Sequence, residues 1–383
     1  MAPSKILTRD FVLAFFVHFV HTSANYILVP TLPVYLSRLK TPESEIGVLI
    51  GVFSVSSLIF RPLVGKGLLR FPEKTFMVAG AIFTAFSSAA YLVASPFWPF
   101  FVVRAFQGVG LAFYFTSSTT LIANISPEER RGQSLSYFFL ASNIAFALAP
   151  SFGMFLINRC SFTILFFFCT AISLVSLYLT TCLRKREVIP LQGEEAKGDG
   201  IFSRKALPAS IMTFFTHMVW GSLTAFFPLY AIDHGVANPG FFFAVYAAML
   251  ILWRTLGGKL LDLWGKEKVL FPCFINLIVA TFILAFSETL PMFILVAVIW
   301  GSGIAFIYPG LVALALELAG PARGPAMGTF TAFADLGAGI GAMIMGIVLT
   351  VTNYQIMFLC LSLVSLFNFS YFNFFLRKRR EPR

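Results

Sequence analysis

Long apolar segments, each near the length of a membrane-spanning helix, follow one another along the whole chain. A helix needs about 20 mostly apolar residues to cross the hydrocarbon core of a bilayer. Segments of this length occupy 11–36, 46–64, 76–94, 97–125, 135–157 and 162–183, and then 207–232, 241–263, 269–286, 290–318, 326–351 and 356–376. The pattern predicts an all-α integral membrane protein of about twelve transmembrane helices.

One polar stretch, 184–206, is longer than any other break and contains the run RKREVIPLQGEEAKGDG. It separates an N-terminal half, 1–183, from a C-terminal half, 207–383. Each half has six of the predicted spans, and because six is even, both halves enter the membrane in the same orientation. We therefore predict a 6+6 arrangement of two parallel six-helix halves, which are related by an axis along the membrane normal.

The composition suits a bilayer and does not suit water. Hydrophobic residues make up 58% of the chain and charged residues only 12%, whereas a soluble domain has about a quarter of its residues charged. The five cysteines lie in or beside apolar segments, with no C-x-x-C spacing and no nearby histidine. They predict apolar packing, and neither a metal site nor a disulfide framework.

The net charge of +11 would suit a nucleic-acid partner, but the distribution of the charge argues against one. Nearly all Lys and Arg residues outside the apolar segments fall in loops on one side of the predicted membrane. Only Arg38, Lys40 and Arg159 fall on the other side. Because cytoplasmic loops carry the excess of Lys and Arg, both termini and the 184–206 linker are predicted to be cytoplasmic. The basic residues therefore report topology, and the expected partner is the lipid bilayer.

The two halves repeat each other at one constant spacing. The aligned pairs are Arg61–Lys66 with Arg254–Lys259, Gly108–Phe113 with Gly301–Phe306, and Gly153 with Gly346. Three separate regions with one offset are hard to obtain by chance, even in a glycine-rich chain. Carriers built from parallel repeats place their site between the halves near the membrane midplane. The repeat therefore favours a carrier over a channel or a membrane enzyme.

A basic loop with spaced glycines follows the eighth predicted span and has Gly258, Asp262, Gly265, Lys266 and Lys268. A related loop follows the second span and has Gly65, Arg70 and Lys74. These loops resemble the motif G-x-x-x-D-R/K-x-G-R/K-R/K of the major facilitator superfamily, which follows the second span and is often echoed after the eighth. The first copy has Leu69, Pro72 and Glu73 at the Asp, Gly and basic positions. The resemblance implies that these loops latch the cytoplasmic side as gates.

Three further segments carry the same resemblance. The run Arg104–Gly110 matches the R-x-x-Q-G-x-G motif common in proton-coupled members. The run Ala149–Gly153 is similar to the G-P-x-x-G motif of the antiporter branch, and 328–337 resembles bacterial members described as drug or sugar efflux carriers. An arginine within a span is costly without a partner, so charge at this depth indicates a functional site.

Polar residues at membrane depth form the candidate substrate and proton pathway. The resemblance implies that spans 1, 4, 7 and 10 line a central cavity, with spans 2, 5, 8 and 11 closing its seams. On this basis we expect the pathway to contain His21, Asn25, Arg104, Gln107, His217 and Asp335. Histidine titrates near neutrality, and a carboxyl group removed from water holds its proton more tightly. Either group can therefore carry a proton.

Other polar residues in the spans have structural explanations. We expect His18 to hydrogen-bond to a neighbouring helix. Arg61 and Arg254 lie near cytoplasmic span ends, where a long side chain reaches the interface. Glu317 is also close to the inner interface and is interpreted as structural.

Together these features imply a monomeric secondary transporter of the bacterial inner membrane. We expect it to export a small organic or amphipathic compound in exchange for protons, with no cofactor. The alternative is a proton symporter or a facilitator that imports a small solute, because many antiporters of the family have a carboxylate in the first span and this chain has none. An enzyme or receptor would need a constellation such as H-E-x-x-H or G-x-S-x-G, and a nucleotide-driven pump would need a phosphate loop. The sequence has none of these.

The topology is testable with reporter fusions. Fusions at Lys197 and at the C-terminus are expected to report the cytoplasm, and a fusion near Arg38 the outside, because the Lys and Arg bias fixes this orientation. Paired alkaline phosphatase and green fluorescent protein reporters at each site give the measurement. A C-terminus on the outside would contradict both the even number of spans and the parallel halves.

Overall fold

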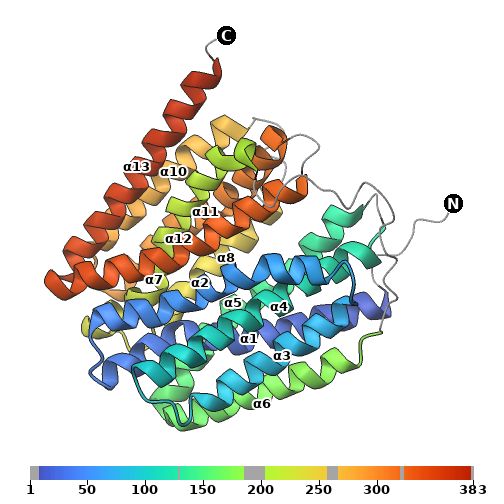
Figure 1. The fold of residues 1–383 in the computed structure, drawn as a ribbon. Coiled ribbons are helices and arrows are strands. Elements are labelled where there is room, and N and C mark those ends of the chain that lie inside the picture. The colour runs from blue at the N-terminus through green and yellow to red at the C-terminus, as the bar shows by residue number, and fades with distance from the viewer. Residues whose placement is uncertain (1–7, 128–129, 185–202, 257–265, 320–322, 381–383) are drawn as a thin grey trace. The chain divides into compact units, whose positions relative to one another are not determined.

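The computed structural model describes residues 8–127, 130–184, 203–256, 266–319 and 323–380, and the regular elements in these ranges are helices (Figure 1). They are α1 (Arg9–Arg38), α2 (Glu43–Gly67), α3 (Glu73–Ala90), α4 (Trp98–Ile125), α5 (Arg131–Arg159), α6 (Phe162–Thr181), η3 (Arg204–Ala206), α7 (Leu207–Asp233), α8 (Gly240–Leu256), α10 (Lys266–Leu284), α11 (Leu290–Ala319), α12 (Arg323–Val351) and α13 (Tyr354–Arg380). An α-helix lies over each of the predicted apolar segments. The all-helical fold class is confirmed for the described residues.

Nine helices in the described ranges are long and apolar enough to cross a membrane, namely α1, α2, α4, α5, α6, α10, α11, α12 and α13. The other predicted spans contain α3, α7 and α8, which are shorter or less apolar. In α7 the polar residues Ser210, Thr213 and Ser222 lower the hydropathy, and all three are fully buried in the protein. A helix surrounded by protein needs no continuous apolar surface, since lipid does not contact its inner faces.

Large apolar side chains are exposed on the surfaces of both parts of the chain. Val93 is 87% exposed, Val351 76% and Leu363 64%. In water such a surface would favour aggregation, whereas in hydrocarbon it costs nothing. The exposed apolar surface therefore agrees with a multi-pass membrane protein.

The chain divides into two compact units. Unit 1 comprises Met1–Leu32 and Val52–Gly198, and unit 2 comprises Pro33–Gly51 and Asp199–Arg383. The division follows the predicted halves, 1–183 and 207–383, except that the end of α1 and the start of α2 group with unit 2. The division into halves with a linker at 184–206 stays a prediction, and residues 185–202 lie outside the described ranges.

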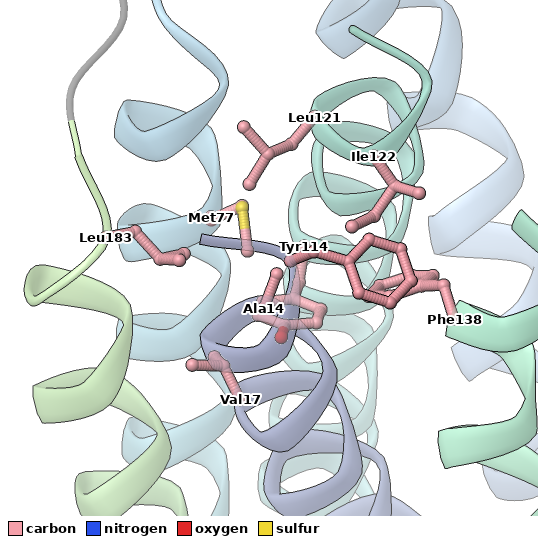
Figure 2. Packing of buried hydrophobic residues seen from close by; sticks show 9 residues of the cluster. Ala14, Val17, Met77, Tyr114, Leu121, Ile122, Phe138 and Leu183 are labelled. Atoms are coloured by element: carbon pink, nitrogen blue, oxygen red, sulfur yellow. The ribbon is translucent and has the colours of Figure 1, made fainter. Parts of the chain in front are cut away.

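Unit 1 has an apolar core where α1, α3, α4 and α5 meet the C-terminal end of α6. Figure 2 shows Met77, Tyr114 and Phe138 converging with Val17 and Leu183. Each of these five side chains is no more than 3% exposed. Since lipid is as apolar as these side chains, the helices gain little from the hydrophobic effect, and close packing holds them together.

Glycines of the repeat bring helices into equivalent close contacts in the two units. A Cβ on Gly110 of α4 would lie 3.1 Å from the backbone oxygen of Gly80, and one on Gly303 of α11 would lie 2.8 Å from that of Cys273. Gly80 and Cys273 are separated by the same spacing as the two glycines. Further contact partners of repeat glycines with this spacing are Phe83 and Asn276, Phe53 and Tyr246, and Ser56 and Met249. The repeat is thus present in the helix contacts as well as in the sequence.

In unit 2, small residues allow α12 to lie directly on α7. A Cβ on Gly221 would overlap the backbone of Ala338, and Gly337 and Gly341 face the backbone of Phe214 and Met218 in the same way. Glycines spaced in this manner let two backbones approach closely, which strengthens packing in the absence of water. The segment Pro33–Gly51 adds to this packing within unit 2.

Gly47 of that segment abuts the backbone of Ala342, and the backbone N–H of Ser44 donates to Thr350 Oγ1 at 3.1 Å. Gly346 in turn would place a Cβ 2.6 Å from the backbone oxygen of Glu43. The beginning of α2 therefore lies against the second half of α12 through backbone contacts.

The α7–α12 contact predicts a clear effect of Gly221→Ala. The added methyl group would have to push the backbone of Ala338 away, which in a packed core costs about 1–3 kcal/mol. Thermal unfolding of the purified protein in detergent should therefore occur at a lower temperature. Gly65→Ala is the matched control, because a Cβ at Gly65 meets nothing within 4 Å. Equal melting temperatures for the two variants would contradict the close α7–α12 contact.

Candidate functional site

A buried hydrogen-bond network in unit 1 is centred on the amide of Gln107. Its Oε1 accepts from Arg104 Nη1 at 2.7 Å and from Tyr91 Oη at 2.6 Å. Its Nε2 donates to Asn25 Oδ1 at 3.0 Å, and Asn25 Nδ2 donates to the backbone oxygen of His21 at 3.1 Å. The network joins α4, the residue that follows α3, and α1. The structure thus brings together Arg104, Gln107 and Asn25, three of the residues proposed from the sequence.

Arg104 is a buried cation, and Gln107 and Phe53, two of its partners, are neutral. It is 6% exposed, and its guanidinium carbon lies 4.7 Å from the centre of the Phe53 ring. The acidic residues of α1 to α6 all lie in first helical turns, where the sequence has Asp10, Glu43, Glu45 and Glu73. The Gln107 carbonyl and the Phe53 face stabilise the charge by dipole and quadrupole.

The two histidines of α1 lie inside unit 1 in aromatic surroundings. His18 is fully buried, and its Nε2 forms a 2.6 Å hydrogen bond with Ser142 Oγ of α5. The expected hydrogen bond from His18 to a neighbouring helix is therefore confirmed. His21 is 1% exposed and stacks on Tyr114, with ring centroids 3.5 Å apart. Its Nδ1 lies 3.4 Å from Ser176 Oγ of α6.

At the first loop motif, the later residues Glu73 and Lys74 bond to other helices, whereas the earlier residues Gly65 and Arg70 are exposed. Lys74 Nζ donates to the backbone oxygens of Thr181 and Leu183 at 2.5 and 2.6 Å, where the negative end of the α6 dipole favours a cation. Glu73 Oε1 accepts from Asn124 Nδ2 of α4 at 2.6 Å. Gly65 and Arg70, the proposed gating residues, are exposed. The replacement Glu73 thus ties α3 to α4, and the retained Lys74 ties it to the end of α6.

The second loop motif falls mostly on residues that are not described. Gly258, Asp262 and Gly265 lie outside the described ranges, and Lys266 is the first residue of α10. The gating role proposed for both loops stays a prediction.

His217 of α7 lines a cavity of about 160 Å³ inside unit 2. Its Nδ1 lies 2.9 Å from the backbone oxygen of Thr213. Because a carbonyl oxygen only accepts, Nδ1 carries the proton, and Nε2 of the neutral ring presents a lone pair. Arg254 of α8 lines the same cavity. A role for Arg254 is absent from the sequence-based set of pathway residues.

Asp335 lies in the middle of α12, one helical turn before Ala338, whose backbone meets Gly221 of α7. The residue is half-buried, and its Oδ2 atom is shielded from solvent. Asp335 and His217 belong to unit 2, whereas His21, Asn25, Arg104 and Gln107 belong to unit 1. The candidate residues therefore form two groups, one in each unit.

Two residues that surround Arg104, Tyr91 and Phe53, are absent from the set proposed from the sequence. Tyr91 looks like one more aromatic residue at a span end, and Phe53 like one more apolar residue of α2. Phe53 becomes recognisable only with the structure, in which Gly108 packs on its backbone oxygen. Nothing in the local pattern points to Tyr91.

The helical fold, the apolar exposed surface and the buried polar network are those of a multi-pass membrane protein. The family model described as Major Facilitator Superfamily matches residues 14–286 and 209–383, and the chain belongs to this superfamily.

Relatives extend along most of the chain. The staphylopine export protein of Staphylococcus aureus (strain Mu50) is 27% identical over 88% of this chain and 88% of its own. Multidrug resistance protein 1 of Bacillus subtilis (strain 168) is 26% identical over 88% of this chain and 89% of its own. A POT family transporter, crystallised with 5-aminolevulinic acid, has a TM-score of 0.81 at 11% identity, covering 97% of both chains. That structural similarity supports the fold. The chain is therefore a multi-pass transporter with efflux-type relatives.

The network predicts that Arg104→Lys folds and inserts but transports poorly. Lysine keeps the charge, yet it loses the planar group that can bond Gln107 and a second acceptor together. Loss of one charge-assisted hydrogen bond lowers the rate by about tenfold or more. The measurement is efflux, from expressing cells, of a fluorescent compound found in a susceptibility screen, normalised to protein in the membrane.

Arg61→Lys is the control for this experiment, since Arg61 is outside the Gln107 network and donates to Ser57 of its own helix. Unchanged efflux by Arg104→Lys would show that the arginine contributes only its charge.

Proposed function

We propose that the chain is a proton-coupled exporter of a small organic or amphipathic compound, working by alternating access. It crosses the bacterial inner membrane about twelve times, as two parallel six-helix halves. Both termini are cytoplasmic, and the unit of function is the monomer. The pathway for substrate and protons contains His21, Asn25, Arg104, Gln107, His217 and Asp335, and the loops with Gly65, Arg70, Gly258, Asp262, Gly265 and Lys266 gate the cytoplasmic side.

The observation that carries the proposal is the network around Gln107. A membrane protein that needed only stability would gain nothing from a buried arginine, whose desolvation is expensive. Arg104 is nevertheless held by a directed hydrogen bond and an aromatic face. Such a preorganised cation is suited to repeated contact with a carboxylate, a carbonyl group or a displaced proton.

Export is supported by two relatives, the staphylopine export protein and multidrug resistance protein 1. The alternative direction is supported by one feature of α1, whose described acidic residue, Asp10, lies in the first turn. Without a carboxylate deep in α1, the proton needs another carrier. Asp335 is the strongest candidate, because it is the only carboxylate that the sequence places deep within a predicted span.

Asp335→Asn is expected to separate coupling from binding. The amide cannot release a proton, so accumulation driven by a pH gradient should be lost, while substrate binding and downhill exchange persist. The measurement uses vesicles reconstituted with the full chain, with and without an imposed pH gradient. A substitution that acts only on folding would instead lower expression, thermal stability and every mode of transport together.

Glu317→Gln provides the matched control, because it also removes a carboxylate but at an exposed position near the end of α11. Should Asp335→Asn respond to the gradient as the wild type does, His21 and His217 become the next candidates for the proton carrier. A wild type that ignores the gradient would establish the facilitator instead.

A further inference from the structure

The cavity inside unit 2 has an aromatic wall and one permanent cation. It is lined by Thr216, His217, Trp220, Tyr246, Arg254, Trp300, Ile304 and Tyr308, from α7, α8 and α11. No carboxylate is among these residues. Its volume of about 160 Å³ is close to that of a protein cavity of about 150 Å³ that holds benzene. The cavity therefore has room for one six-membered ring.

The wall is built by three rings in mutual contact. The Trp220 ring centroid lies 5.3 Å from that of Tyr246 and 5.5 Å from that of Trp300, and the Tyr246 and Trp300 centroids are 4.9 Å apart. On another side, Tyr308 meets His217 edge to face at 5.7 Å. Aromatic rings pack favourably with centroids about 4.5–7 Å apart, so these rings form a packed aromatic wall.

The repeat shows what is special about Arg254. Its counterpart in unit 1, Arg61, donates to Ser57 Oγ at 3.3 Å and lies 5.5 Å from the centre of the Phe115 ring. At the same spacing, Ser57 corresponds to Leu250, which offers no acceptor. Within the described residues, Arg254 therefore has no counterpart of the Ser57 hydroxyl that holds Arg61, and its exposed side chain lines the cavity.

A buried donor in the wall points to a ligand with an acceptor group. Trp300 is 1% exposed, and its Nε1 has no hydrogen-bond partner among the described residues. An indole N–H can only donate, and leaving it unsatisfied in an apolar interior costs about 1–3 kcal/mol. A ligand oxygen would satisfy it. His217 presents a lone pair at Nε2 when neutral, so recognition of an anion falls to Arg254 and Trp300.

We infer that this cavity binds an aromatic ring that carries an anionic group, such as an aryl carboxylate. The ring packs against Trp220, Tyr246 and Trp300, and the carboxylate faces Arg254. This inference names the substrate class of the proposed exporter and rests on that proposed function. An aromatic cage without a cation would suit a quaternary ammonium ion equally well, but Arg254 repels such a ligand.

The experiment is equilibrium dialysis of radiolabelled benzoate against the full chain purified in detergent. Benzoate is expected to bind at one saturable site. Arg254→Gln should weaken binding about tenfold or more, because it removes a charge-assisted hydrogen bond. Trp300→Phe, which keeps a ring but removes the donor, should also weaken binding. Arg61→Gln is the matched control and should bind as the wild type does.

Competition by cyclohexanecarboxylate and by benzyltrimethylammonium tests the two halves of the ligand separately. Weak competition by both supports the inference, since each probe lacks either the aromatic ring or the anion. Stronger competition by the cation, equal losses in Arg254→Gln and Arg61→Gln, or absence of saturable benzoate binding would each overturn it. Melting curves exclude unfolding as the cause of a loss.

Binding is measured without a gradient, so it is independent of proton coupling. If vesicles with the wild-type chain show no gradient-driven transport while benzoate binding still depends on Arg254, the exporter proposal is contradicted and the proposed ligand class is not. Vesicles that export another compound while benzoate fails to bind would contradict the ligand class alone.

Discussion

A polar group placed in hydrocarbon must find its hydrogen-bond partners within the protein, and the side chain of Gln107 meets this constraint for several helices at once. Its carbonyl accepts from both Arg104 and Tyr91, and its amide nitrogen donates to Asn25. Gly108, the next residue, lets α4 approach the backbone of α2 so closely that the Phe53 ring lies beside the Arg104 guanidinium. Two adjacent residues of one motif therefore act together: Gly108 lets the helix backbones approach, and Gln107 provides the hydrogen bonds.

Unit 2 uses the same backbone contacts for different chemistry. Gly301 packs on Tyr246 as Gly108 packs on Phe53, but the counterparts of Arg104 and Gln107 are Ala297 and Trp300. The cation and amide are thus replaced by a methyl group and an indole. Unit 1 gains a buried polar network, and unit 2 gains an aromatic cavity. Gene duplication would explain the shared backbone contacts, and divergence the two specialised interiors.

Much of this architecture follows from sequence because its causes are periodic. Apolar length predicts where helices lie, and the constant offset of the glycines recurs in the helix contacts. The motif residues Arg104 and Gln107, three positions apart in α4, are hydrogen-bonded to each other.

Other features depend on contacts between distant segments, which leave no local pattern. Tyr91 joins the network only because the turn after α3 lies beside α4, and Lys74 binds carbonyl groups at the end of α6. Arg254 was expected to extend to the interface from its place near a span end. Its side chain is exposed, and it also lines the cavity. Position within the span does not reveal this cavity, because its wall comes from three different helices.

The negative charge of the proposed ligand connects the cavity of unit 2 with the proposed direction of transport. Moving one elementary charge across a membrane potential of 100 mV changes the free energy by about 2.3 kcal/mol. An anion that leaves a cytoplasm of negative potential moves downhill in that field, and a proton that enters does so too. Exchange of one anionic ligand for one proton therefore draws on the potential twice, in addition to the proton gradient. An importer of the same ligand would have to work against the first of these terms. The permanent positive charge of Arg254 and the proposed exchange for protons on Asp335 are thus energetically consistent with export.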